Sequence, residues 1–369
     1  MFSLLLFRVK NQTSFCFSTG LGKTLPKKKP QSELPDIPTE EQLSQHSESS
    51  ESNYYAATKD SPCRERMFNE KDICLVLKMK KGRIYDRWMG TITVSRDVSK
   101  CGVLTALGDG VVKNKDVHWD DFVKRTLDLP KTDHLVKIEG IGIEKSFLYL
   151  ITEHLVCDPL DSIITCDSST QGEITSIMSV TEVMKMLAGI LEGMEILQSY
   201  GFLHPGLSTK KILYTKQGQC KLYDFCLAED APKIIAFKKT QNEVSKTLNL
   251  FPPEALFRSE YTTESDVWAT AIVIWEVIAN GKPPFSVDKE IKPGDNVIAP
   301  NLLWPERFLQ LRNLVLFECW SENCALRPSI HALKASFKTI FEKLIDHSFY
   351  EIPKSTLYTP MGASYVEEY

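Results

Sequence analysis

The sequence lacks the cysteine spacings of a metal site or a disulfide framework. Its 369 residues include ten cysteines, but they form no CxxC pair and no Cys/His group with the spacing of zinc ligands. Zinc sites and small disulfide-rich domains depend on such spacings. The pattern predicts reduced thiols in a cytoplasmic protein.

An excess of charge of either sign is also missing. The chain carries 44 Lys and Arg against 48 Asp and Glu, a formal net charge of −4. A nucleic-acid-binding domain needs a basic field, so we expect no nucleic-acid partner. Hydrophobic residues at 43% and charged residues at 25% are typical of a soluble globular protein.

A complete transmembrane segment, which needs about 20 apolar residues, is absent from the sequence. Residues 1–7 form a short apolar run, and basic residues follow at Arg8, Lys10 and 27–29. This run is either a disordered terminus or the cytoplasmic end of a span lost by truncation or alternative splicing. Membrane association therefore stays open as an alternative.

Composition divides the chain into three parts. Residues 1–68 contain a long stretch rich in Pro, Ser, Glu and Lys, which predicts a disordered arm. Residues 69–345 carry the apolar patterns of a folded domain, and residues 346–369 predict a flexible tail that contains tyrosines.

The folded part changes its pattern along its length. Its first eighty residues predict a helix at 118–129 and five short strands, at residues 73–77, 91–94, 102–107, 135–141 and 147–151. The rest predicts helices, the first of them capped by Ser179 or Thr181 and followed by Gly201. Further helices are expected at residues 264–279, 306–321 and 331–345. The fold class is α+β.

Seven short motifs in one order resemble those of the protein kinase superfamily, in its receptor tyrosine kinase branch. They are LYLITEHL at 148–155, HPGLSTKKIL at 204–213, CKLYDFC at 220–226, FPPE at 251–254, SDVW at 265–268, IWEV with GKPPF at 274–285, and CW with RPS at 319–329. The resemblance implies a bilobal fold. The N-lobe, residues 69–152, would be a small five-stranded sheet with one helix, and the C-lobe, residues 153–345, would be mainly helical.

The resemblance also implies a nucleotide site between the lobes. Thr152 takes the gatekeeper position, and the matching nucleotide-site positions are Lys81, Gly82, Thr152, Glu153, Leu155 and Asp224. Lys78, Lys80 and Lys81 could also replace a strand lysine, since some kinases take that lysine from the glycine-rich loop.

Four positions that handle phosphate or protons in the family are degenerate. Thr105 replaces the strand lysine and Arg125 the helix glutamate; Gly206 replaces the catalytic aspartate and Lys211 the metal-binding asparagine. Phosphoryl transfer depends on these groups. Glycine cannot accept a proton, and a lysine opposes bound Mg²⁺.

Residues that support the fold are kept. By resemblance they are His204, Phe225, Glu254, Asp266, Trp268 and Arg327. Loss of the chemistry with retention of the fold predicts a pseudokinase, a catalytically inactive scaffold or allosteric regulator in phosphotyrosine signalling. The alternatives are a weakly active atypical tyrosine kinase that binds ATP, and the cytoplasmic part of a truncated receptor. No catalytic residue and no metal ligand is assigned; ATP is left open as a cofactor and Mg²⁺ is disfavoured.

Tyrosines near both ends are candidate phosphorylation sites: Tyr54, Tyr55, Tyr358, Tyr365 and Tyr369. Tyr358 begins a YTPM sequence of the Y-x-x-M form that SH2 domains of phosphoinositide 3-kinase regulatory subunits bind. The expected partners are other kinases, signalling adaptors and an SH2-domain protein at Tyr358.

Overall fold

The alternating apolar runs of the first part of the domain form a six-stranded sheet in the computed structural model. The model describes residues 66–81, 84–95, 98–108, 117–144, 147–164, 179–241, 250–279, 281–284 and 308–346. The strands are β1 (Met67–Asn69), β2 (Ile73–Lys81), β3 (Tyr85–Ser95), β4 (Val98–Leu107), β5 (Ile138–Glu144) and β6 (Phe147–Glu153). Their order is β1-β5-β6-β4-β3-β2.

The sixth strand, β1, was not among the five expected from the sequence. It pairs in parallel with β5, whereas the other neighbours in the sheet are antiparallel. The chain can approach this closely because residue 140 is a glycine: a Cβ atom there would lie 2.1 Å from the carbonyl oxygen of Arg66. The contact is three residues long, which gives no recognisable alternation in the sequence.

One helix, α3 (Trp119–Thr126), accompanies the sheet, as expected. Its buried side chains recur at helical spacing: Trp119, Phe122, Val123 and Thr126. The first three belong to a hydrophobic core that continues from the sheet into the helical lobe.

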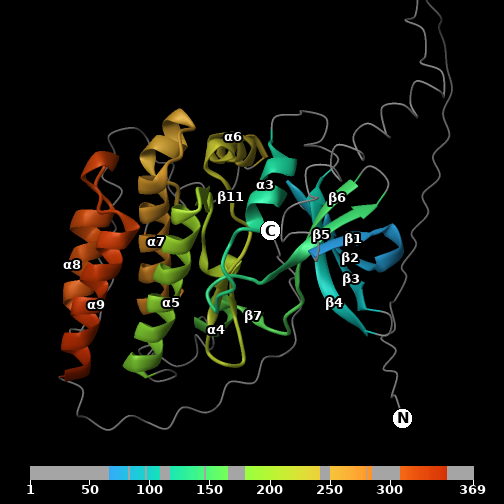
Figure 1. The fold of residues 1–369 in the computed structure, drawn as a ribbon. Helices are drawn as coiled ribbons and strands as arrows, with labels where there is room; N and C mark the ends of the chain where they lie inside the picture. The colour runs from blue at the N-terminus through green and yellow to red at the C-terminus, as the bar shows by residue number, and fades with distance from the viewer. Residues whose placement is uncertain are drawn as a thin grey trace, which may run out of the picture. The chain divides into compact units, whose positions relative to one another are not determined.

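The second lobe is mainly helical, and Figure 1 shows its long helices α5, α7 and α9 on the side away from the sheet. Its helices are α4 (Leu160–Ile164), α5 (Val180–Ser199), α6 (Ala231–Gln241), α7 (Thr263–Ile278), α8 (Leu309–Asn313) and α9 (Ile330–Asp346). Ser179 caps α5 in a capping box with Glu182, as the sequence predicted. Every residue of α7 from Ser265 to Ile278 is buried, so this helix forms the centre of the lobe.

Short turns and helices connect these elements. Two π-helical segments occur, at Glu254–Arg258 and Leu314–Cys319. The second one continues α8, so the single helix expected at residues 306–321 is two segments. The 3-10 turns are Glu70–Asp72, Thr209–Lys211, Ala228–Asp230 and Cys324–Leu326.

Two small sheets join the segments that carry the motifs. One contains β7 (Asp158–Pro159), β9 (Ile212–Tyr214) and β10 (Cys220–Leu222), and the other pairs β8 (Phe202–Leu203) with β11 (Cys226–Leu227). The pairing of β8 with β11 brings the segment around Gly206 beside the segment around Asp224.

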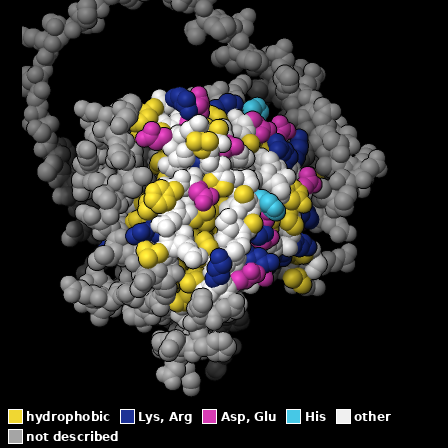
Figure 2. Space-filling view, turned by 90° about the vertical axis from the view of Figure 1, so that its left-hand side faces the viewer, with side chains coloured by type: hydrophobic (Ala, Val, Ile, Leu, Met, Phe, Trp, Pro, Cys, Tyr) yellow, Lys and Arg dark blue, Asp and Glu magenta, His cyan; other side chains and the backbone are white. Residues whose placement is uncertain are grey.

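The surface next to α8 and α9 carries charges of both signs between apolar side chains (Figure 2). In the described part of the chain, no helix combines the length and the apolar character needed to cross a bilayer.

Candidate functional site

Asp224 lies at the centre of a group of basic side chains. Lys211 Nζ donates a hydrogen bond to Oδ2 of Asp224 in an ion pair, and Arg87 Nη2 lies 2.5 Å from Oδ1. Burial alone would raise the pKa of the Asp224 carboxyl, but the neighbouring charges, Lys211 first, hold it well below its ordinary value. The carboxylate is therefore ionised and balanced by protein cations.

Arg87 is a site residue that the sequence did not reveal. It lies on β3, directly opposite Thr105 on β4, so its side chain reaches the cleft from the strand next to the missing lysine. Its guanidinium carbon lies 5.9 Å from the ring centre of Tyr85 and 5.5 Å from that of Tyr223. Only the pairing of β3 with β4 indicates its role.

The position of the catalytic base, Gly206, faces the ammonium group of Lys238 on α6. Gly206 has φ +89°, and a Cβ atom there would lie 2.9 Å from Lys238 Nζ. That nitrogen donates a 2.7 Å hydrogen bond to the carbonyl oxygen of Pro205. Burial, and then the charge of Lys211, lower the pKa of Lys238 to about 7. Lys238 comes 32 residues after Gly206 in the chain, so no local motif connects the two.

A cavity of about 50 Å³ lies next to this group, between the sheet, α3 and the segment around Asp224. Thr152 and Asp224, two of the expected nucleotide-site residues, line it, and so does Thr105, the residue aligned with the strand lysine. Much of the remaining wall is aromatic: Tyr85, Trp119, Phe122, Tyr223 and Phe225. The cavity therefore combines an apolar wall with the Arg87–Asp224 ion pair.

The other expected nucleotide-site residues lie elsewhere or cannot be placed. Glu153 forms an ion pair with Lys221 at 2.9 Å, and Leu155 packs against a separate apolar cluster. Neither lines the cavity. Gly82 and the side chain of Lys81 lie outside the described residues, as do Tyr54, Tyr55, Tyr358, Tyr365 and Tyr369.

The Lys78 side chain is turned away from Asp224. Its ammonium pairs with Asp86 at 2.9 Å and lies 5.0 Å from the Trp88 ring centre. Both partners alternate with Arg87 along β3, so they lie on the opposite face of the sheet. Lys78 therefore does not replace the strand lysine in this structure.

Helix α3, which contributes Trp119 and Phe122 to the cavity, is held at both ends by contacts with the helical lobe. Arg125, aligned with the helix glutamate, pairs instead with Glu229 at 2.8 Å and lies over the ring of Phe202. At the other end of α3, Asp230 accepts hydrogen bonds from the backbone N–H of His118 and interacts with its ring. The two acidic residues of the segment Ala228–Asp230 thus hold both ends of the helix.

The fold-supporting residues are buried and joined by hydrogen bonds. Asp266 accepts hydrogen bonds from the backbone N–H of His204 and from the Tyr261 hydroxyl, the latter at 2.8 Å. Burial raises the pKa of Asp266 to about 7 and lowers that of His204 to about 3. Phe225 packs edge-on against Phe202, with ring centres 5.3 Å apart.

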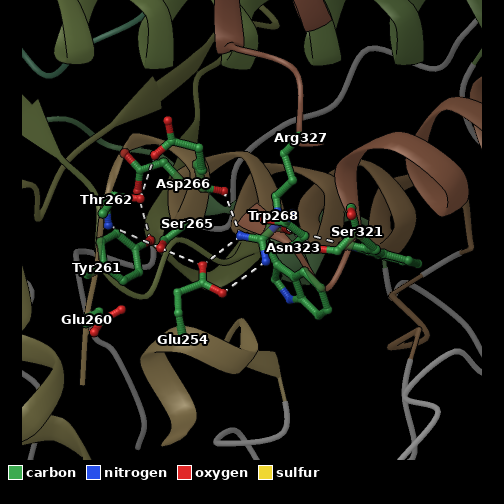
Figure 3. Close-up of polar contacts among 12 residues, drawn as sticks. Glu254, Glu260, Tyr261, Thr262, Ser265, Asp266, Trp268, Ser321, Asn323 and Arg327 are labelled. Atoms are coloured by element: carbon green, nitrogen blue, oxygen red, sulfur yellow. Dashed lines mark hydrogen bonds and ion pairs between the residues drawn. The ribbon is translucent and has the colours of Figure 1, made fainter. Parts of the chain in front are cut away.

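Glu254 and Arg327 form a buried bidentate ion pair (Figure 3). The two contacts are 2.6 and 3.0 Å long, and Ser265 donates a further hydrogen bond to Glu254. The guanidinium carbon of Arg327 lies 4.9 Å from the Trp268 ring centre. The pair connects the segment after α6 to the segment before α9.

Mg²⁺ does not fit the residues present. Asp224 is paired with two cations, and the sequence resemblance aligns Lys211 with a second metal-binding residue. The described ranges contain no group of three His, Cys, Asp or Glu side chains arranged to hold a metal ion.

Comparison with known proteins agrees with the fold. The sequence profile of the family described as protein tyrosine and serine/threonine kinase matches residues 113–337, which begin after strand β4. Ephrin type-A receptor 5 of Rattus norvegicus is 27% identical over 219 residues, which are 56% of this chain and 20% of that protein. The Drosophila melanogaster tyrosine-protein kinase transmembrane receptor Ror is 24% identical over 269 residues, 72% of this chain and 37% of that protein.

The chain thus spans well under half of the length of these relatives. The profile nevertheless covers more than half of the chain, and the two lobes have the architecture expected of the family. The chain belongs to the protein tyrosine and serine/threonine kinase family, and its kinase domain is related to those of the Eph and Ror receptors.

Proposed function

We propose that the domain is a pseudokinase that acts as a scaffold or allosteric regulator in phosphotyrosine signalling. The proposal rests mainly on the basic side chains that lie beside residues 224 and 206, the two positions where phosphoryl transfer needs a free carboxylate. Asp224 is neutralised by Lys211 and Arg87, and Gly206 has a lysine ammonium beside it. Asp224 is then not available to bind a metal, and residue 206 has no side chain of its own to accept a proton.

A transfer assay tests the proposal. The full chain is incubated with labelled ATP, a poly-Glu/Tyr substrate and Mg²⁺ or Mn²⁺, beside the Lys211→Ala/Asp224→Ala double variant. We expect equal counts, at background, from both proteins. Transfer that disappears when Asp224 is removed would show an active kinase and contradict the proposal.

The alternative is an atypical kinase domain that binds ATP without metal. It is favoured by the basic side chains of Arg87, Lys211 and Lys238, which lie near the carboxylate of Asp224. ATP at 100 times its Kd would stabilise the fold by about 2.7 kcal/mol. The measurement is the thermal unfolding temperature without ligand, with ATP in EDTA, and with ATP and Mg²⁺. A rise with ATP in EDTA indicates metal-independent binding, a rise only with Mg²⁺ indicates metal-dependent binding, and no rise indicates no binding.

The partners we propose are kinases and adaptors of the same signalling class. The relatives are named as receptors, and the chain matches only part of their length. We include the proposal that this domain is the cytoplasmic part of a receptor-like protein. In this proposal another kinase phosphorylates the tyrosines near the chain ends, and an SH2-domain protein binds at Tyr358.

A further inference from the structure

The carboxylate of Asp224 is bound by cations from both lobes. Arg87 extends from strand β3 of the sheet lobe, while Asp224 and Lys211 belong to the helical lobe. Arg87 binds Oδ1 of Asp224 and Lys211 binds Oδ2, so both carboxylate oxygens are held by protein cations. The contact crosses 137 positions of sequence.

These charges are shielded from water. The side chains of Lys211, Asp224 and Arg87 are 5%, 10% and 17% exposed, so solvent screens their attraction weakly. A buried charge left without its partner is strongly unfavourable. Separation of the lobes would have to break such a pair.

The guanidinium of Arg87 also lies between one aromatic ring from each lobe. Tyr85 belongs to β3 and Tyr223 directly precedes Asp224, and both rings are within 6 Å of the guanidinium carbon. Tyr85 and Tyr223 are both buried. Cation–π contacts with the two rings add to the ion pair in holding Arg87.

The backbone of Asp224 is consistent with this arrangement. Its φ is +68°, a left-handed conformation that few non-glycine residues adopt. Such a conformation persists where surrounding contacts determine it. Here those contacts include the two ion pairs of its side chain.

We propose that Arg87, Asp224 and Lys211 form a lobe lock, which holds the two lobes closed in the absence of nucleotide and metal. The lock replaces the strand lysine, whose position Thr105 now occupies, with an arginine from the neighbouring strand. It does not depend on whether the domain transfers phosphate. It makes the closed form the resting form, independent of ATP.

Hydroxyl-radical labelling of the full chain, read by mass spectrometry, tests the lock. Tyr223 reports opening of the lobes, and Trp275, which is buried within α7, reports unfolding of the helical lobe. Asp224→Asn keeps the size of the side chain and leaves Arg87 in place, but removes the charge. We expect the Tyr223 labelling rate to rise at least about tenfold, since loss of one partner of a buried pair shifts such equilibria by about a hundredfold or more.

Two further variants sharpen the test. Arg87→Met, which keeps the alkyl stem, should raise Tyr223 labelling as Asp224→Asn does. Arg125→Met is the matched control, because its pair with Glu229 also crosses the lobes but is 40% and 48% exposed. In Arg125→Met we expect the Tyr223 labelling rate to change by less than about fivefold.

Three outcomes would overturn the lock. Tyr223 labelling in Asp224→Asn and Arg87→Met could equal that of the unchanged chain. Trp275 labelling could rise in parallel, which would mean that the pair stabilises the fold as a whole. EDTA could raise Tyr223 labelling of the unchanged chain, which would assign closure to a bound metal. Because none of these readouts measures transfer, the lock and the proposed inactivity can fail separately.

Discussion

The ammonium group of Lys238 lies directly beside the Cα atom of Gly206, where a larger residue would place its side chain. The Lys238 ammonium lies 2.9 Å from the point where a Cβ atom on Gly206 would stand. The nitrogen is held there by the carbonyl oxygen of Pro205. A side chain at residue 206 would therefore require the Lys238 ammonium group to shift.

This relationship predicts the effect of Gly206→Ala. The variant must accept an unfavourable backbone, at a cost of about 1–2 kcal/mol. It must also shift the flexible end of Lys238 and strain its hydrogen bond to Pro205, which adds up to about 1 kcal/mol. Urea unfolding should therefore show a loss of about 1–3 kcal/mol in the free energy of unfolding.

Gly218→Ala is the matched control. Gly218 has φ +76°, but a Cβ atom there meets only the Tyr214 hydroxyl, at an ordinary 3.4 Å. Its cost should be the backbone part alone. In a Lys238→Ala background the extra cost of Gly206→Ala should disappear; if it persists, Lys238 is not what excludes a side chain at residue 206.

The Glu254–Arg327 pair predicts a large loss of stability on truncation. The Arg327 and Glu254 side chains are 0% and 2% exposed, so Glu254→Gln leaves a buried guanidinium without its counter-charge. We expect a loss of about 3–5 kcal/mol in urea unfolding. Glu254→Gln/Arg327→Met should lose less than the sum of the two single changes.

The control for this pair is the exposed contact of Arg258 with Glu260. The two side chains are 60% and 58% exposed, and Arg258→Met should cost less than about 1 kcal/mol. Equal losses for Arg258→Met and Glu254→Gln would show that burial of the Glu254–Arg327 pair is unimportant.

Glu276 predicts a pH dependence of stability. Burial raises the pKa of this carboxyl from 4.5 to about 7, although a hydrogen bond from Thr209 opposes the shift. Between these values the unfolded chain releases the proton and the folded chain keeps it. This group therefore lowers the free energy of unfolding as pH rises from 4.5 to 7, with no further change above.

Glu276→Gln removes that contribution. Relative to the variant, the unchanged chain should lose about 1–3 kcal/mol between pH 5 and pH 8, as measured by urea unfolding at each pH. Asp266, whose pKa is also raised to about 7, is present in both proteins and cancels in the comparison. Parallel stability curves would contradict the raised pKa of Glu276.

Tyr358 predicts recruitment of an SH2-domain protein. The Tyr358→Phe variant cannot take up phosphate at the YTPM sequence, so it should lose capture by the SH2 domains of phosphoinositide 3-kinase regulatory subunits from pervanadate-treated cells. Tyr365→Phe is the matched control in the same segment and should retain capture. If Tyr358→Phe is captured as well as the unchanged chain, the docking proposal is wrong.

Much of the architecture could be predicted because it is recorded in local patterns. The capping box of Ser179 and Glu182 and the apolar spacing of α5 are contained within about twenty residues. The motif order likewise indicated a kinase fold and named Glu254 and Arg327 among the residues that support it, and the structure joins these two in a buried ion pair. Strand β1 was missed because it has three residues and is paired through a close approach at Gly140.

For the candidate site, the sequence predicted only which catalytic groups of the family are replaced. Aligned positions indicate that Thr105, Gly206 and Lys211 replace the groups that phosphoryl transfer needs. They do not indicate what fills the vacated places. Lys78 was considered as a source of the strand lysine, yet the alternation of β3 places its partners on the other face.

Residue types at fixed local spacings indicate the family and the two lobes, and by alignment they predict the loss of the catalytic groups. The identity of the cations around Asp224 follows from the tertiary structure alone. Arg87 arrives there through the register of β3 with β4, and Lys238 through the placement of α6. Their charges act over a few ångströms in space, between segments far apart in the chain, and no local pattern records such a distance.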